Sequence, residues 1–64
     1  MVMYFVFYST SDVFRTEEIL NANGIECKVV PTPVQDMAYC GVCIETSEGG
    51  AKELIQDMEY DVLN

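Results

Sequence analysis

The side chains best suited to covalent chemistry in this 64-residue chain are its three cysteines, Cys27, Cys40 and Cys43. A cysteine thiolate is a strong nucleophile and a metal ligand, so each of them is a candidate for thiol chemistry, a disulfide or a metal site. The chain has no histidine, which excludes a hydrolytic cysteine–histidine pair. An odd number of cysteines does not suit a secreted disulfide framework and favours a reducing compartment.

Cys40 comes at the end of a long connection, in the stretch PTPVQDMAYCG. A hairpin is usually closed by about two to five residues, and this connection is longer. Pro31-Thr32-Pro33 fixes two φ angles and predicts a stiff, extended exit from the preceding strand. Gly41 permits a positive φ or a close approach of another backbone. The pattern predicts a loop that displays Cys40 as a reactive thiol.

Cys40 and Cys43 form the pattern CGVC, which matches the Cys-x-x-Cys pattern of dithiol redox proteins. In those proteins the first cysteine opens a helix, whereas here the pattern runs into a predicted strand. Extended residues three apart have Cα atoms roughly 10 Å apart on opposite faces, and a disulfide needs about 4.4–6.8 Å. Only a tight turn at Gly41 would bring the pair together, so Cys43 is a secondary candidate.

A zinc site is also poorly supported by the cysteines. Three cysteines without histidine leave a tetrahedral site one ligand short, unless a carboxylate or a second subunit completes it. We therefore predict no metal and no cofactor.

The first half of the chain predicts a strand followed by a helix. Residues 2–8, VMYFVFY, are a β-branched and aromatic run typical of a central strand. Residues 9–24 predict a helix that starts at one of three hydroxyl residues and stops at Asn23-Gly24. Its apolar stripe is Val13, Thr16 and Leu20, with Glu17 at the edge. Glu17 either reaches solvent or hydrogen-bonds the long loop.

The second half predicts two strands and a helix. Residues 25–30 alternate as a strand with Cys27 on the apolar face, where it acts as a small hydrophobic side chain. Residues 41–46 form the next strand, with Cys43 facing away from the core. Residues 47–58 predict a helix capped by Ser47, and its apolar face is Ala51, Leu54, Ile55 and Met58. Residues 60–64 either add a short edge strand or fray.

The chain is therefore expected to be a single α+β domain over residues 1–64. The order β-α-β-β-α, with a possible short last strand, predicts a ferredoxin-like split βαβ arrangement with both helices on one face of the sheet. The opposite face would then carry Tyr4, Val6 and Tyr8. A homodimer built face to face would cover this apolar patch.

The charge of the chain limits the kinds of partner that it is expected to bind. Eleven acidic residues against three basic ones give a formal net charge of -8. Without a basic surface, we expect no binding to nucleic acid or to anionic membranes. No signal-peptide pattern or membrane-spanning run is present, which favours a cytoplasmic location. The acid excess, with Asp36 near Cys40 in sequence, disfavours a thiolate. Lys28 would offset this effect of the acidic residues if Lys28 lay across the hairpin from Cys43.

With these elements in order, the chain resembles the small bacterial domain family of selenium/sulfur carrier-like proteins, over roughly residues 3–58. The most specific part of the resemblance is PTP followed at this distance by CG. The resemblance implies a cytosolic carrier in which Cys40 holds sulfur or selenium as a persulfide or selenosulfide. A donor enzyme such as a cysteine desulfurase would load it, and an acceptor protein would receive the cargo.

The chain also departs from this family's usual pattern. Similar sequences commonly have a basic residue just after PTP and a serine shortly before CG. This chain has Val34 and Gln35 at the first place, Ala38 and Tyr39 at the second, and an additional Cys43.

Three functions therefore remain open from the sequence. The first is a non-catalytic carrier or adaptor with Cys40 as its thiol, supported by Pro31, Thr32, Pro33 and Gly41. The second is a protein-interaction or dimerisation module without thiol chemistry, in which Cys40 only packs. The third is a dithiol redox protein that needs Cys40 and Cys43 to pair.

Overall fold

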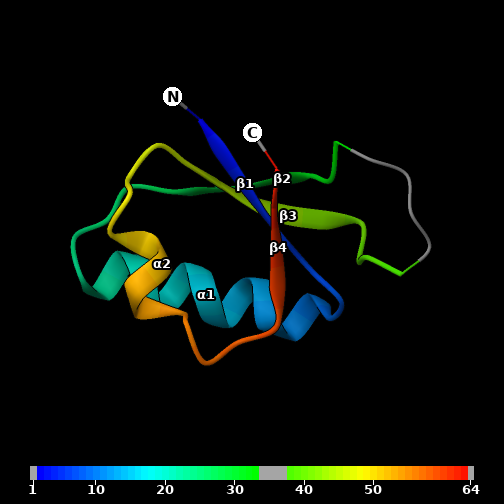
Figure 1. Ribbon diagram of the computed structural model, residues 1–64, viewed down its shortest axis with the longest axis horizontal. Coiled ribbons are helices and arrows are strands. Elements are labelled where there is room, and N and C mark those ends of the chain that lie inside the picture. Colours follow the sequence, from blue (N-terminus) through cyan, green and yellow to red (C-terminus); the bar gives the residue numbers. More distant parts are fainter. Residues whose placement is uncertain (1, 34–37, 64) are drawn as a thin grey trace.

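The computed structural model of the chain describes residues 2–33 and 38–63 (Figure 1). Its elements follow the order β-α-β-β-α-β: β1 (Met3–Phe7), α1 (Thr10–Ala22), β2 (Lys28–Pro31), β3 (Val42–Thr46), α2 (Ala51–Leu54) and β4 (Tyr60–Leu63). The predicted α+β class is confirmed. Of the two predicted outcomes for the C-terminal tail, the structure shows the edge strand.

The four strands form one sheet in the order β2-β3-β1-β4, and every neighbouring pair is antiparallel. The long apolar strand β1 is central, as the sequence predicts, with β3 on one side and β4 on the other. Phe5 marks the register, because it lies across from Ile44 of β3 and from Val62 of β4. β2 is shorter than predicted and begins at Lys28, so Cys27 precedes the strand.

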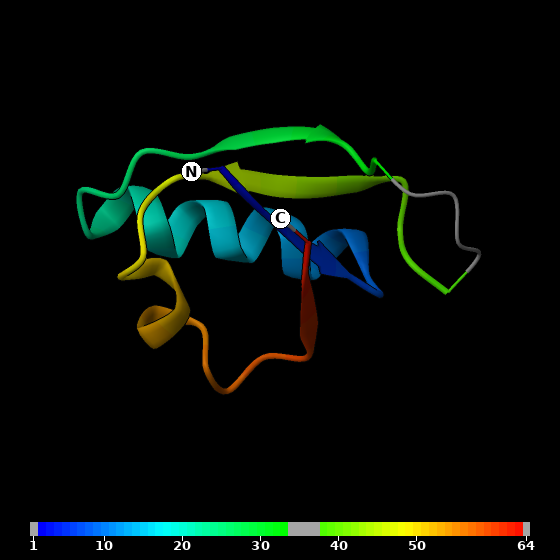
Figure 2. The same ribbon diagram turned by 45° about the horizontal axis from the view of Figure 1, so that its top comes forward.

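Both helices lie on the same side of the sheet, as Figure 2 shows. The core between them joins residues of β1 and β3 to residues of both helices, and its fully buried members are Phe5, Phe7, Val13, Leu20, Ile44, Ala51 and Ile55. Tyr60 of β4 closes the core edge-on to Phe5, with ring centroids 5.4 Å apart and planes at 89°. Neither helix in the described ranges has the length and apolar character of a membrane span.

Helix α1 begins and ends where the sequence predicts. Ser9 is the N-cap, but its hydroxyl lies 2.8 Å from the hydroxyl of Ser11 and makes no capping bond. Gly24 ends the helix with φ 75°, a conformation that glycine adopts without strain. The predicted stripe is confirmed, because Val13, Thr16 and Leu20 are the buried residues of α1.

Helix α2 is much shorter than predicted. It spans Ala51–Leu54, with Gly50 as its N-cap, so the predicted helix over residues 47–58 capped by Ser47 is wrong. Glycines at positions 49 and 50 disfavour helix at its start, since glycine costs about 1 kcal/mol relative to alanine. The apolar positions still serve the core: Ala51 and Ile55 are buried, and Leu54 and Met58 pack against it.

The sheet face opposite the helices, which we call the outer face, is less exposed than predicted. Cross-strand partners share a face. The outer face therefore has two rows, Val30–Cys43–Val6–Asp61 and Lys28–Glu45–Tyr4–Leu63. Val6 and Cys43, in the middle of the first row, are both 0% exposed. Contacts within the chain thus already cover part of the apolar patch assigned to a dimer partner.

Candidate functional site

The backbone around Cys40 is held by three hydrogen bonds. The Cys40 amide donates to the carbonyl of Phe7 at 2.9 Å, which ties the end of the β2–β3 connection to the end of β1. Thr32 makes the other two: its amide donates to the carbonyl of Gly41 at 3.0 Å, and its hydroxyl donates to the carbonyl of Cys40 at 2.9 Å. Thr32 therefore links the two ends of the connection and fixes the backbone of Cys40.

The other residues predicted to support the loop are Pro31, Pro33 and Gly41. Pro31 is the last residue of β2 and lies across from Val42. Pro33 is exposed at a bend. Gly41 does not have a positive φ, and no atom of the described residues comes within 4 Å of where a Cβ would stand, so neither predicted reason for a glycine is met among the described residues. The predicted positions Val34, Gln35 and Asp36 lie outside the described residues.

The Cys40 thiol is half-buried and packs against the hydrophobic core. Its Sγ donates a hydrogen bond to the carbonyl of Val42 at 3.0 Å. Cys40 is thus a partly accessible thiol on a backbone held by hydrogen bonds.

Cys43 differs from Cys40 in burial. It is 0% exposed on the outer face, across from Val6 and Val30. Burial raises the pKa of the Cys43 thiol, a hydrogen bond with Thr32 partly opposes this rise, and the nearby Cys40 and Glu45 add to it. A buried thiol with a raised pKa is a poor nucleophile at neutral pH.

Cys27 lies at the opposite end of the hairpin and is half-buried against the core, as predicted. Its Sγ is 3.8 Å from Oδ1 of Asn21. Burial raises the pKa of the Cys27 thiol, and the negative charge of Glu17 raises it further. Glu17 therefore stands beside Cys27, and in the described ranges no hydrogen bond joins it to the β2–β3 connection.

These two raised pKa values predict that the protein loses stability at alkaline pH. Folding favours the protonated form of Cys27 and Cys43, so their contribution is complete below about pH 8.5, the ordinary cysteine value. It is lost as the pH rises through their higher folded-state values. We expect the free energy of unfolding, measured by urea denaturation, to fall as the pH rises above about 8.5.

The matched control for this prediction is the double variant Cys27→Ala and Cys43→Ala, whose stability should depend less steeply on pH over the same interval. An equal slope in the variant and the wild type would contradict the assignment to these two thiols.

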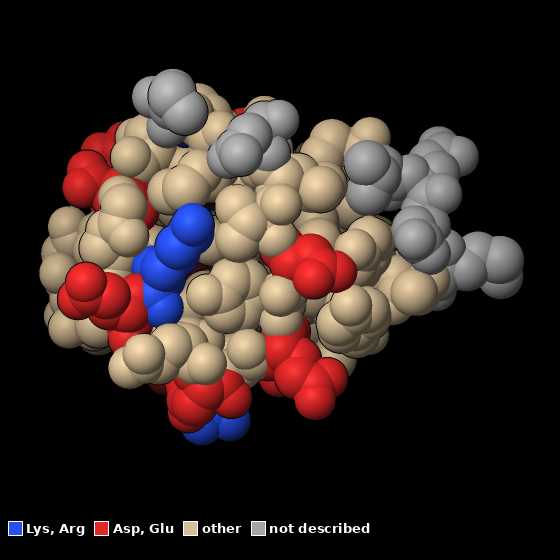
Figure 3. Space-filling view, in the orientation of Figure 1, with Lys and Arg blue, Asp and Glu red and all other residues tan. Residues whose placement is uncertain are grey.

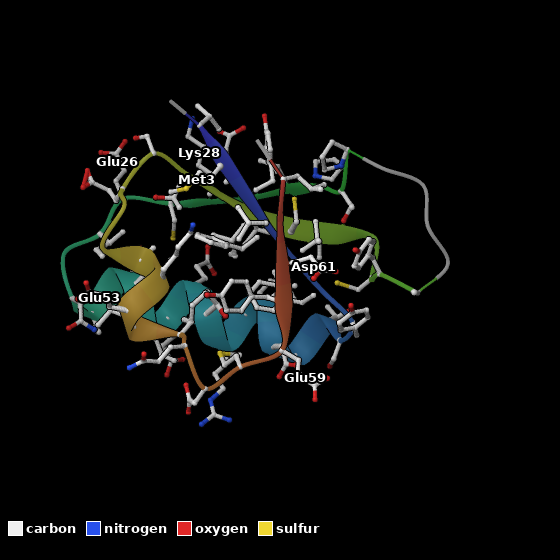
Figure 4. All side chains as sticks on the ribbon, in the orientation of Figure 1. Met3, Glu26, Lys28, Glu53, Glu59 and Asp61 are labelled. Atoms are coloured by element: carbon white, nitrogen blue, oxygen red, sulfur yellow. The ribbon has the colours of Figure 1, made fainter. Side chains whose placement is uncertain are left out.

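No basic side chain supports a thiolate at Cys43 from across the hairpin. Lys28 lies across from Glu45, and Val30 takes the position across from Cys43, so Lys28 is not in the position from which it could offset the acidic charge at Cys43. Figure 4 places Lys28 near the end of the sheet that holds Met3 and Glu26. On the face seen in Figure 3, the basic groups lie toward the left and the bottom.

The geometry does not bring the three cysteines together. All three are free thiols; Cys40 packs toward the core, whereas Cys43 lies on the outer face. In the described part of the chain, no three cysteine and carboxylate side chains are grouped so as to hold a metal ion. Cys40 is therefore left as the single thiol that combines partial exposure with a backbone fixed on both sides.

One feature beside Cys40 has no counterpart in the sequence prediction. The hydroxyls of Tyr8 and Tyr39 both donate to the same oxygen of Asp61, at 3.0 Å and 2.5 Å. The three residues are far apart in sequence, so no local spacing could reveal the cluster. The signal available was the position of Tyr39 immediately before Cys40.

Comparison with protein-family models identifies the family of the chain. The family model described as "Putative Se/S carrier protein-like" matches residues 3–63, which is nearly the whole chain. The chain belongs to this family. Comparisons with curated proteins and with solved structures gave no match. The family match confirms the resemblance found in the sequence and includes β4, which the resemblance had not covered.

Proposed function

We propose that this Se/S carrier-like protein is a non-catalytic carrier or adaptor in which Cys40 holds sulfur or selenium between a donor enzyme and an acceptor protein. The observation that carries the proposal is the difference between the thiols. Cys40 is partly accessible at the end of an anchored connection, whereas Cys43 is fully buried. Membership of the Se/S carrier-like family supports the same function.

The transfer needs no oxidant. The Cys40 sulfur, on losing its proton, attacks the terminal sulfur of a persulfide on the donor enzyme. A bond forms between Cys40 Sγ and that sulfur, the donor's S–S bond breaks, and the donor leaves as a thiolate. The acceptor's thiolate repeats this exchange on the loaded Cys40, and a selenium atom in the same terminal position would transfer in the same way.

The Cys40 environment sets one requirement for this step. The hydrogen bond from Cys40 Sγ to the Val42 carbonyl must break when the proton leaves. A donor enzyme that presents cationic groups or amide donors at this end of the sheet would stabilise the thiolate. The net charge of -8 makes a basic partner surface the complementary one.

The test is intact mass spectrometry after anaerobic incubation of the reduced protein with a cysteine desulfurase and cysteine. The expected result is the gain of one sulfur, located on Cys40 by peptide mapping. Absence of any gain would favour the interaction module without thiol chemistry.

We also propose that the fold is ferredoxin-like and that the protein is cytoplasmic. The strand order β2-β3-β1-β4, with one helix after β1 and one after β3, supports a ferredoxin-like arrangement of two split β-α-β units. The three free thiols support a cytoplasmic location.

We further propose that two copies pair through the outer face. Tyr4, Val30 and Leu63 are half-buried there, next to residues that the chain already buries. Val30→Glu would place a charge in this interface, so sedimentation should show a dimer for the wild type and a monomer for the variant. Phe14→Glu, at an exposed site on α1, is the control that should remain dimeric. A wild type that is monomeric at high concentration would exclude the dimer.

A further inference from the structure

Three residues beside Cys40, which we call the tyrosine clamp, join parts of the chain that are distant in sequence. Tyr8 follows β1, Tyr39 precedes Cys40, and Asp61 lies in the middle of β4. The two tyrosine rings pack together with centroids 5.4 Å apart, tilted by 32°. Both hydroxyls donate to Oδ2 of Asp61. One carboxylate oxygen thus fastens the end of the β2–β3 connection to β1 and β4.

The orientation of Asp61 follows from the sheet. Asp61 lies across from Val6, so its side chain is on the outer face. Figure 4 shows it projecting from β4 toward the side where the β2–β3 connection returns. Hydrogen bonds to a charged acceptor are about twice as strong as neutral ones, and a distance of 2.5 Å is at the short end of their range. The clamp therefore consists of two hydrogen bonds to one carboxylate oxygen on the exposed residue Asp61.

The clamp contacts the same stretch of backbone as the hydrogen bonds that hold the backbone of Cys40. The Cys40 amide donates to the carbonyl of Phe7, and the neighbouring residues Tyr39 and Tyr8 are the two rings of the clamp. A backbone bond and a side-chain network thus hold residues 39–40 against residues 7–8. Releasing the network would remove one set of contacts that holds residues 39–40, whereas the backbone bond to Phe7 and the two bonds of Thr32 would remain.

We propose that Tyr8, Tyr39 and Asp61 are positioning residues that hold the backbone of Cys40 and thereby keep its thiol half-buried. The inference rests on the proposed function as far as the release of a bound sulfur is concerned, whereas the position of the free thiol does not depend on it. In the closed clamp, Cys40 keeps its hydrogen bond to Val42 and reacts slowly with small molecules. A donor or acceptor would reach the thiol as the clamp opens.

The experiment compares Tyr39→Phe and Asp61→Ala with the wild type by two rates. The first is alkylation of Cys40 by iodoacetamide, followed by peptide mass mapping. The second is release of the bound sulfur from loaded protein by dithiothreitol. Both rates should rise about tenfold in Tyr39→Phe, the change expected when one hydrogen bond to a charged group is lost from the closed state. The double variant Tyr39→Phe and Asp61→Ala should have nearly the same rates as Asp61→Ala alone, because both changes disrupt the same hydrogen-bond network.

The matched control is Tyr4→Phe, which removes a tyrosine hydroxyl that interacts with Glu45 in the other row of the outer face. Both Cys40 rates should stay at the wild-type value there, which separates positioning of Cys40 from a general loss of stability. Tyr8→Phe is the second clamp variant, in case Asp61→Ala fails to fold.

The outcomes separate the clamp from the carrier function. Faster alkylation in the clamp variants of a protein that never accepts sulfur would support the clamp and reject the carrier. Normal loading with unchanged rates in Tyr39→Phe and Tyr8→Phe would reject the clamp and keep the carrier. Equal acceleration in Tyr4→Phe would also overturn the clamp.

Discussion

Cys40→Ser is expected to lower sulfur loading from near one sulfur per chain to background, with the fold preserved. The serine hydroxyl can still donate to the Val42 carbonyl, and the backbone bonds of residue 40 do not involve its side chain. The free energy of unfolding should therefore change by less than about 1 kcal/mol. Loading requires a sulfur nucleophile, and a hydroxyl oxygen cannot form the persulfide.

The two remaining cysteines supply the controls for this result. Cys43→Ser and Cys27→Ser should load normally if they fold, because the burial and raised pKa of these thiols disfavour attack on the donor. Cys43→Ser places a hydroxyl in a fully buried position and should lower the stability by about 1–3 kcal/mol. Equal loading of Cys40→Ser and wild type would exclude Cys40 as the carrier thiol.

Phe5→Ala is expected to remove a large part of the protein's free energy of unfolding. Phe5 is 0% exposed at the centre of the core and packs edge-on against Tyr60 of β4. Truncating a buried phenylalanine costs about 3–5 kcal/mol. A chain of this size has a total free energy of unfolding of about 3–10 kcal/mol, so the loss is a large part of the whole. Circular dichroism during urea denaturation measures it.

Phe14→Ala is the matched control, because it makes the same substitution at a side chain of α1 that is 53% exposed. Its free energy of unfolding should stay within about 0.5 kcal/mol of the wild type. Similar losses in the two variants would contradict the position of the core between the sheet and the helices.

The sequence by itself determined the elements whose signal is local. The apolar run of β1 is too short for a helix and rich in β-branched and aromatic residues, so it could only be a buried strand. The stripe and the Asn23-Gly24 stop located α1, because helix periodicity and a left-handed residue are properties of neighbouring positions. The spacing of PTP and CG identified the family that the comparison confirms over residues 3–63.

Local signals were weaker in the second half of the chain. The apolar positions Ala51, Ile55 and Met58 were predicted to pack in the core and do so, yet the helix predicted around them spans only Ala51–Leu54. Periodicity reports which side chains are buried, and burial does not require every intervening residue to be helical. The sequence left open whether Lys28 lies across from Cys43, and the structure places Val30 there, because register depends on how the strands pair.

The surroundings of Cys40 were decided by tertiary structure. The sequence named Cys40, Thr32 and Gly41, but it could not show that the Cys40 amide meets Phe7 or that Thr32 closes the connection. The clamp of Tyr8, Tyr39 and Asp61 joins three segments that only the antiparallel placement of β4 beside β1 brings together. Residue types and their spacing are local properties, and they are enough to select a candidate thiol. The burial, hydrogen bonds and neighbours of that thiol depend on contacts between distant parts of the chain.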